Sequence, residues 1–207
     1  MGRDWRRQQQ RDYFFRKAKE EGYRSRAAYK LLQINQRHKL IHRGDIVLDL
    51  GAAPGGWSQV AAKLVGPQGT VVAVDKAAME PLPGVTFVQG DLTAPDLAER
   101  IRTLVGGMVD VVLSDAAPST SGVRVRDHAL SIALAQGALR VAQALLKPGG
   151  HLVVKAFEGE DFPAFLAKVR RHFRSVKPYS PPASRRESAE VYVVAKGFRP
   201  EPESEPA

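Results

Sequence analysis

The sequence contains no cysteine among its 207 residues, so disulfide bonds and thiolate metal sites are excluded. It also lacks long hydrophobic runs: no apolar stretch approaches the roughly 20 residues that a helix needs to cross a bilayer. Nothing resembles a signal peptide, and we expect a cytoplasmic protein with no membrane partner. Hydrophobic residues make up 43% of the chain, which is enough for the core of one compact domain.

Acidic residues are scarcer than basic ones, 22 against 31, and the net charge is +9 at pH 7. Residues 1–30 alone hold ten Lys or Arg and four Asp or Glu, interleaved with aromatic side chains. This pattern favours a nucleic acid as partner over a membrane surface or a merely solvated helix face. We therefore predict a basic, RNA-binding N-terminal extension over residues 1–36. A folded domain over 37–197 and a disordered Pro- and Glu-rich tail over 198–207 should follow it.

Short β-branched runs alternate with helical segments from about residue 45 onward. The pattern predicts helices over residues 56–66, 94–106, 126–150 and 160–173. It predicts strands over residues 45–51, 69–75, 84–91, 108–115, 151–157 and 190–198. Strict alternation of this kind predicts an α/β fold with a mostly parallel sheet covered by helices on both faces.

The segment DLGAAPGGWSQ, residues 49–59, almost matches a dinucleotide-binding turn but lacks its middle glycine. The G-x-G-x-x-G positions fall on Gly51, Ala53 and Gly56, and the middle glycine is the one that admits a pyrophosphate. Gly51 and Gly55 still permit a tight turn. The helix that starts near Trp57 offers its N-terminus to an anionic group such as a carboxylate.

Ionisable side chains end the strands that follow this loop. Asp75 lies where an acidic group binds ribose hydroxyls, and Asp91 is placed to accept a hydrogen bond from an adenine amino group. The predicted site thus suits adenosine and a carboxylate but leaves little room for a diphosphate. S-adenosylmethionine fits this description, whereas NAD and ATP do not.

Two more strand ends supply groups that can activate a methyl acceptor. Asp115 and Lys155 are predicted to open into the same cleft. A ribose hydroxyl must lose its proton as it attacks, and a lysine can take that proton where burial and a neighbouring cation lower its pKa. Lys30 could be that cation, Asp115 could orient the amine, and Glu190 could complete the arrangement.

These residues lie in motifs that resemble the FtsJ/RrmJ (RlmE) family of ribosomal RNA 2′-O-methyltransferases. The motifs are RSRAAYKL, DLGAAPGGWSQ, SDAAPSTSG, VVKAFEGE and SAEVYVVA, in the family's order from about residue 23 to residue 197. The resemblance places the family's Lys-Asp-Lys-Glu tetrad on Lys30, Asp115, Lys155 and Glu190. It places the family's cofactor positions on Gly55, Trp57, Asp75, Asp91 and Asp115. One departure is Ala189, where the family more often has Arg.

The resemblance implies a Rossmann-like, S-adenosylmethionine-dependent methyltransferase fold with a seven-stranded sheet. It also implies methylation of a uridine ribose in the A loop of large-subunit rRNA, with Lys155 as general base. We expect a monomer that acts on the assembled or assembling ribosomal subunit. Methylation of a base nitrogen, a cap 2′-O-methyltransferase and an assembly factor without catalysis are the alternatives. His38 and His42 have the i, i+4 spacing of a zinc pair but no third ligand, and we predict no metal site.

Overall fold

The computed structural model describes residues 13–119, 121–184 and 189–200. A single seven-stranded sheet forms the centre of the molecule, in the order β3-β2-β1-β4-β5-β7-β6. Its strands are β1 (Ile46–Leu50), β2 (Thr70–Asp75), β3 (Val85–Gln89), β4 (Val109–Ser114), β5 (Leu146–Phe157), β6 (Phe173–Tyr179) and β7 (Glu190–Phe198). Strand β7 runs antiparallel to both of its neighbours, and the other pairs are parallel. The predicted mostly parallel seven-stranded sheet is confirmed.

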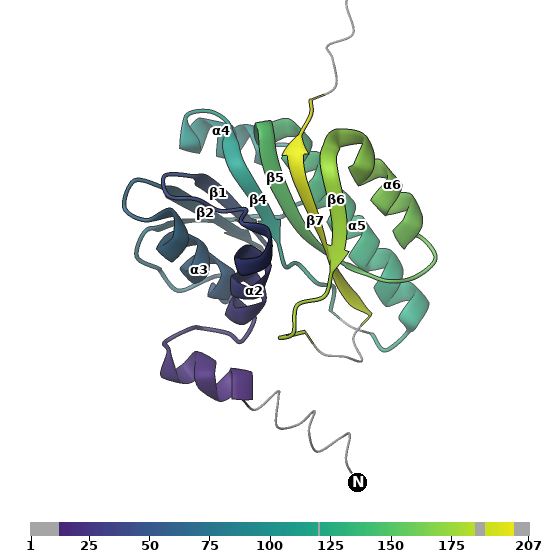
Figure 1. The fold of residues 1–207 in the computed structure, drawn as a ribbon, viewed down its shortest axis with the longest axis horizontal. Helices are drawn as coiled ribbons and strands as arrows, with labels where there is room; N and C mark the ends of the chain where they lie inside the picture. The colour runs from purple at the N-terminus through teal and green to yellow at the C-terminus, as the bar shows by residue number, and fades with distance from the viewer. Residues whose placement is uncertain (1–12, 120, 185–188, 201–207) are drawn as a thin grey trace, which may run out of the picture.

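Helices cover both faces of this sheet (Figure 1). On one face α2 (Ala28–His38) and α3 (Gly56–Val65) bury Leu31, Ile34 and Trp57 against alternate residues of the strands. On the other face α4 (Leu97–Val105), α5 (Arg124–Leu145) and α6 (Phe162–His172) build a larger apolar core. With both faces covered, the central strands are apolar on both sides, as parallel strands usually are. No helix in the described part of the chain is both long and apolar enough to span a bilayer.

The structure corrects two details of the expected elements. Strand β6 is missing from the runs identified in the sequence, because it is an edge strand whose side chains are mostly exposed or half-buried. The expected helix over 126–150 ends earlier, at Leu145, and the next residue begins β5. The segment Pro148–Gly149 therefore lies within the first half of a strand. Leu146 already pairs with Val109 of β4, so the chain joins the sheet at this residue and the helix ends before it.

The expected domain boundaries also differ from the structure. The limit between residues 36 and 37 falls inside α2, a helix that contributes to the core. Residues 13–20 form a further helix, and Ala18 is buried with Tyr29 and Ala183. Residue Phe198 is buried in β7 and packs on Phe173, so it does not belong to a tail. Residues 1–12 and 201–207, which are a third of the expected arm and most of the expected tail, lie outside the described residues.

Candidate active site

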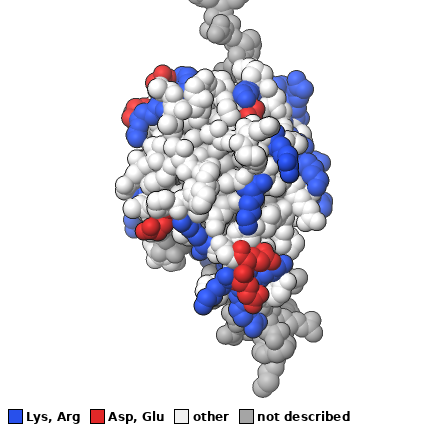
Figure 2. Space-filling model, turned by 90° about the vertical axis from the view of Figure 1, so that its left-hand side faces the viewer, with Lys and Arg blue, Asp and Glu red and all other residues white. Residues whose placement is uncertain are grey.

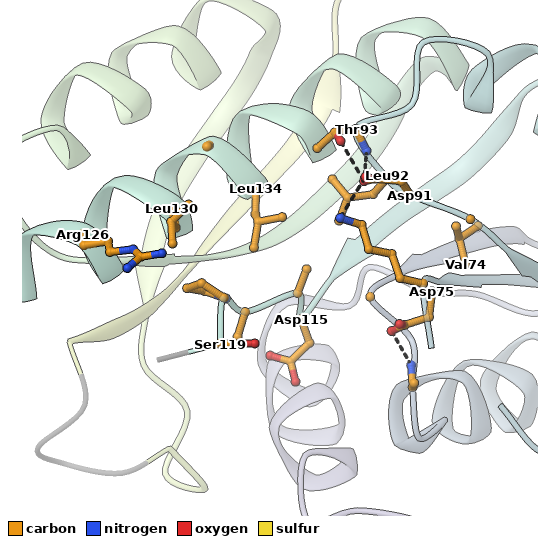
Figure 3. A pocket seen from close by; sticks show the side chains of 18 residues that line it. Val74, Asp75, Asp91, Leu92, Thr93, Asp115, Ser119, Arg126, Leu130 and Leu134 are labelled. Atoms are coloured by element: carbon orange, nitrogen blue, oxygen red, sulfur yellow. Dashed lines mark hydrogen bonds and ion pairs between the residues drawn. The ribbon is translucent and has the colours of Figure 1, made fainter. Parts of the chain in front are cut away.

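A cavity of about 720 Å³ opens at the carboxyl ends of the parallel strands, where ligands bind in folds of this class. Figure 3 shows its two sides: Leu130 and Leu134 project from α5, and Asp75 and Asp115 lie across from them at the strand ends. Leu130 is 41% exposed, which is unusual for a large apolar side chain but expected for one that lines a ligand cavity. The volume suits a nucleoside-sized ligand.

The loop after β1 brings the backbone close to this cavity. Gly51 has φ +73°, and a Cβ atom there would lie 2.7 Å from the Cα of Ala116. No larger residue fits without moving the segment after β4. Gly55 precedes α3 with φ +111°, a conformation that L side chains rarely adopt. Ala53, which replaces the pyrophosphate glycine, donates its N–H to Asp75 Oδ2 at 2.9 Å and so links the loop to the end of β2.

Asp75 and Asp91 both line the cavity, as predicted. The second oxygen of Asp75 accepts from the N–H of Ala77 at 2.8 Å. Asp91 forms an ion pair of 2.8 Å with Lys76 and accepts from the N–H and hydroxyl of Thr93. These hydrogen bonds from Lys76 and Thr93 lower the pKa of Asp91 to about 2, and the group is an anion at neutral pH. Both carboxylates are held in place before any ligand arrives.

The four expected catalytic residues come together beside the cavity as two ion pairs. Lys155 Nζ donates to Asp115 Oδ1 at 2.9 Å and to its backbone carbonyl at 2.7 Å. Lys30 Nζ donates to Glu190 Oε1 at 2.6 Å, across 160 positions of the sequence. Both lysines are only 7% exposed, and each is satisfied by a carboxylate, as buried charges require. Lys155 lies two residues before the end of β5 rather than at the end itself.

The hydroxyl of Tyr192 joins the two ion pairs, and this residue was not among those predicted from the sequence. It donates to Asp115 Oδ1 at 2.7 Å, lies 3.2 Å from Glu190 Oε1, and accepts from Lys30 Nζ at 3.1 Å. Burial and the two neighbouring carboxylates raise the pKa of this phenol well above its usual value. Tyr192 therefore keeps its proton and remains a donor. The only sequence signal is its position two residues after Glu190, on the same face of a strand.

Comparison with known proteins decides the family. The model of the FtsJ-like methyltransferase family matches residues 23–198. The chain belongs to this family. It is 55% identical over 187 residues to ribosomal RNA large subunit methyltransferase E of Methanothrix thermoacetophila, covering 90% of this chain and 72% of that protein. The enzyme of the same name from Archaeoglobus fulgidus is 55% identical over 188 residues, covering 91% and 96%.

A solved structure extends the likeness to the fold. The crystal structure of a ribosomal RNA methyltransferase from Plasmodium falciparum superposes with a TM-score of 0.77 at 27% identity. The match covers 85% of this chain and 98% of that chain. Together with the strand order, this confirms the Rossmann-like methyltransferase fold.

S-adenosylmethionine is the methyl donor that an FtsJ-like methyltransferase uses, and the cavity fits it. Leu92, Leu130 and Leu134 offer apolar surface for a planar base, and Asp75 offers carboxylate oxygens at the edge of the cavity. Gly55 and Trp57 do not line the cavity. The Trp57 ring packs 5.6 Å from that of Tyr192, and its Nε1 donates to the carbonyl of Ala27 at 2.8 Å. Trp57 can therefore contact a ligand only through its backbone N–H, which lies at the start of α3.

Arg24 is a second residue of this FtsJ-like methyltransferase that the sequence analysis did not single out. Its guanidinium donates to the carbonyl oxygens of Pro54, Glu80 and Pro81 at 2.6–3.2 Å. Its own N–H donates to the side chain of Gln59 on α3. Arg24 thus ties the segment before α2 to the cofactor loop and to the segment after β2. The sequence shows only one arginine among many in a basic region.

Asp49, in the middle of β1, is a fully buried carboxyl group beneath the loop. Its Oδ2 accepts from the hydroxyl of Ser58 at 2.6 Å, whereas its Oδ1 has no hydrogen-bond partner among the described residues. Burial, opposed by the Ser58 hydrogen bond, raises the pKa of Asp49 to about 7. The group therefore titrates near neutral pH without any contact with solvent.

The spacing of His38 and His42 does not correspond to one helical face. Helix α2 ends at His38, and Lys39 takes a left-handed conformation with φ 51° that turns the chain away. His42 lies beyond this turn, where its N–H donates to Asp45. Across the described residues, no cluster of three or more His, Asp or Glu is placed to hold a metal ion.

Proposed function

We propose that this protein transfers a methyl group from S-adenosylmethionine to the 2′-hydroxyl of a uridine in large-subunit rRNA. Membership of the FtsJ-like methyltransferase family and the names of its relatives support an rRNA substrate. The observation that carries the choice of a 2′-hydroxyl is the contact between Lys155 and Asp115. Asp115 lines the cofactor cavity, so it holds an amine beside the place where a methyl group would be presented.

Lys155 acts in this proposal as the general base. The Lys155 ammonium must first release a proton to solvent. The neutral amine then has two N–H bonds and one lone pair, and both N–H bonds are used by the carboxylate and the carbonyl of Asp115. The lone pair is then left for the substrate hydroxyl. As the hydroxyl oxygen bonds to the methyl carbon, its proton passes to Lys155 Nζ. S-adenosylmethionine supplies the methyl group, and the pair of electrons of the breaking bond stays on its sulfur.

Lys30 and Glu190 form the second half of the site. Glu190 Oε1 accepts from Lys30 and from the Ser184 hydroxyl at 3.0 Å, so the carboxylate is fixed from two sides. The Lys30 ammonium is consequently held in one position, where it can stabilise the negative charge that develops on the ribose oxygen. We assign Lys30 and Glu190 to this electrostatic role and Asp115 to the orientation of Lys155.

The cofactor positions follow from the same cavity. We assign the ribose hydroxyls to Asp75 and the adenine amino group to Asp91, each of which retains acceptor capacity beside its internal hydrogen bonds. Gly51 and Gly55 allow close approach of the backbone. The free N–H groups at the start of α3, including that of Trp57, suit the carboxylate of the amino-acid part.

The proposal also covers the location, the oligomeric state and the partners of the protein. We infer a cytoplasmic monomer that acts on rRNA in the assembled or assembling large subunit, with no membrane partner and no metal. The basic segment before α2 would contact RNA, and the fold from α2 to β7 would form the methyltransferase domain. The likeness to large-subunit rRNA methyltransferases favours rRNA over a cap as the substrate.

The deciding experiment maps 2′-O-methyl groups across total RNA from cells with and without the gene. We expect one uridine of the large-subunit rRNA to lose its methyl group, and the gene should restore it. The variants Lys155→Ala and Lys155→Arg should not restore it, because neither side chain can accept the proton at neutral pH. Lys147→Ala is the matched control, since Lys147 lies on the same strand and also pairs with an aspartate, Asp110, at 2.8 Å.

Two results would contradict the proposal. An unchanged 2′-O-methyl map, with a base methyl lost instead, would exclude the ribose as the acceptor. Near-normal turnover of Lys155→Arg would show that the residue supplies a fixed positive charge and not a base.

A further inference from the structure

A second hollow, of about 550 Å³, lies toward the opposite edge of the sheet from the cofactor cavity. It is formed by the end of α2, the first half of β5, the start of β6 and the end of β7. The residues that matter here are Arg37, His38, His151, Arg174, Lys177 and Lys196. In the β5–β7 register, His151 pairs with Lys196 and Lys155 pairs with Tyr192. The hollow is thus four residues along the strands from the tetrad, or about 13 Å.

The hollow, which we call the basic hollow, is lined by four Lys or Arg side chains and by no acidic residue. None of the four forms an ion pair with a carboxylate of the described chain, whereas Lys76, Lys147 and Lys155 all do. Figure 2 shows Lys and Arg side chains along the right-hand margin of the molecule, where the α2 face of Figure 1 lies after the turn. Like charges gathered without counter-charges repel one another, so an anionic ligand would relieve them.

Internal contacts hold part of the basic hollow in shape. Lys196 Nζ donates to the carbonyl of His38 at 2.9 Å, at the end of α2. The Arg37 guanidinium lies 5.5 Å from the centre of the Tyr179 ring, and the His38 ring packs on the same tyrosine. His38 Nε2 is buried and has no hydrogen-bond partner in the described part of the chain. Burial lowers the pKa of His38, and Arg37, Lys196 and Lys177 lower it further, which reports a positive potential in the hollow.

We infer that the basic hollow binds a backbone phosphate of the RNA substrate, away from the nucleotide that is methylated. This inference rests on the proposed function. Arg and Lys together suit a phosphodiester, and no Phe, Tyr or Trp lines the hollow to stack on a base, so the contact would be independent of sequence. Helix α2 carries Lys30 near its start and Arg37 near its end, about 10 Å apart along the axis. One folded RNA can therefore reach both the tetrad and the hollow.

The test removes two exposed cations of the hollow, in the variant Arg174→Gln/Lys177→Gln. Lys168→Gln/Arg171→Gln is the matched control: it makes the same change in net charge with exposed side chains of α6, which packs on the other face of the sheet. Large ribosomal subunits from cells that lack the gene serve as the RNA. Steady-state methylation gives kcat and KM, equilibrium binding across a salt series gives the salt slope, and calorimetry gives the affinity for S-adenosylmethionine.

We expect KM for the subunits to rise on the order of tenfold, with kcat within about twofold and the cofactor affinity unchanged. The log–log salt slope should become shallower by about 0.7–0.9, the contribution of the one phosphate contact that is lost. The control should behave as the unaltered protein. If the hollow variant matches the control in KM and in salt slope, the inference is wrong. The proposed function fails separately, if the unaltered protein binds the subunits but does not methylate them.

Discussion

The substitution Tyr192→Phe tests whether the two ion pairs of the active site work as one unit. It removes a single hydroxyl and keeps the ring that packs on Trp57. The hydroxyl donates to Asp115 at 2.7 Å and accepts from Lys30 at 3.1 Å, so it is the only described group that contacts both pairs. Without it, Asp115 still has Lys155 and Lys30 still has Glu190.

The expected loss of activity in Tyr192→Phe follows from the ion pairs that the substitution leaves intact. No charged group is left without a partner, so the loss should be near that of one hydrogen bond to a charged group, about 1.5–3 kcal/mol. If that bond matters most in the transition state, kcat should fall by about 10- to 150-fold. KM for RNA and the affinity for S-adenosylmethionine should change little, because the hydroxyl does not line the cofactor cavity. The pH dependence of kcat should also shift, since the link between the titrating groups is broken.

The assay is methyl transfer at saturating cofactor and subunits across a pH series, with calorimetry for the cofactor and urea unfolding for stability. Tyr179→Phe is the matched control for stability, because it removes the same atom from a half-buried tyrosine on the neighbouring strand. The reasoning is refuted if Tyr192→Phe keeps kcat within twofold and an unchanged pH profile while its free energy of unfolding falls. Tyr192 would then be a structural residue that merely lies near the tetrad.

Three further predictions follow from the cofactor site and the N-terminal region. Asp75→Ala should weaken S-adenosylmethionine binding by about 1–3 kcal/mol in calorimetry, and an unchanged affinity would exclude Asp75 as a ribose ligand. Burial raises the pKa of Asp49 from 3.8 to about 7, so the folded state holds a proton that the unfolded state has released. The free energy of unfolding should therefore fall, by at most ~4 kcal/mol, as the pH rises between these values. In the Asp49→Asn variant, the free energy of unfolding measured with urea should not fall in this way as the pH rises. Deletion of residues 1–12 should flatten the salt slope of RNA binding without changing cofactor affinity; an equal slope would place the RNA surface elsewhere.

The sequence predicted the central strands well because burial on both faces produces an unmistakable pattern. Residues 46–50 and 70–75 are β-branched or apolar at nearly every position, which only a covered parallel strand requires. Strand β6 has no such requirement, because it lies at the sheet edge and mixes Arg174, Lys177 and Pro178 with its apolar residues. The end of α5 was also misplaced. Its helical pattern continues past Leu145, but pairing of Leu146 with β4 overrides it.

The candidate site was predictable where chemistry coincides with a strand end. Asp75, Asp91, Asp115 and Lys155 lie at or near the carboxyl ends of parallel strands, which meet at one edge in any such sheet. Tyr192 gives no comparable signal, because an aromatic residue in a strand usually indicates core packing. The contact of its hydroxyl with the two ion pairs depends on the antiparallel register that pairs Tyr192 with Lys155. The contacts of Arg24 were not predictable for a different reason. Its partners are backbone carbonyls, which no side-chain pattern reveals.

The reversed direction of β7 places its two ends in the two proposed binding regions. Because β7 runs against its neighbours, it begins with Glu190, a member of the tetrad, and carries Lys196 near its far end, in the basic hollow. Helix α2 likewise carries Lys30 in the tetrad and Arg37 in the basic hollow. Both elements pack in the same core cluster, which sets the spacing between the tetrad and the hollow. An RNA that satisfies both must itself have a defined shape, and a short flexible strand that reaches only the tetrad would lose the second contact. The structure thus favours a folded RNA as the substrate over an isolated strand.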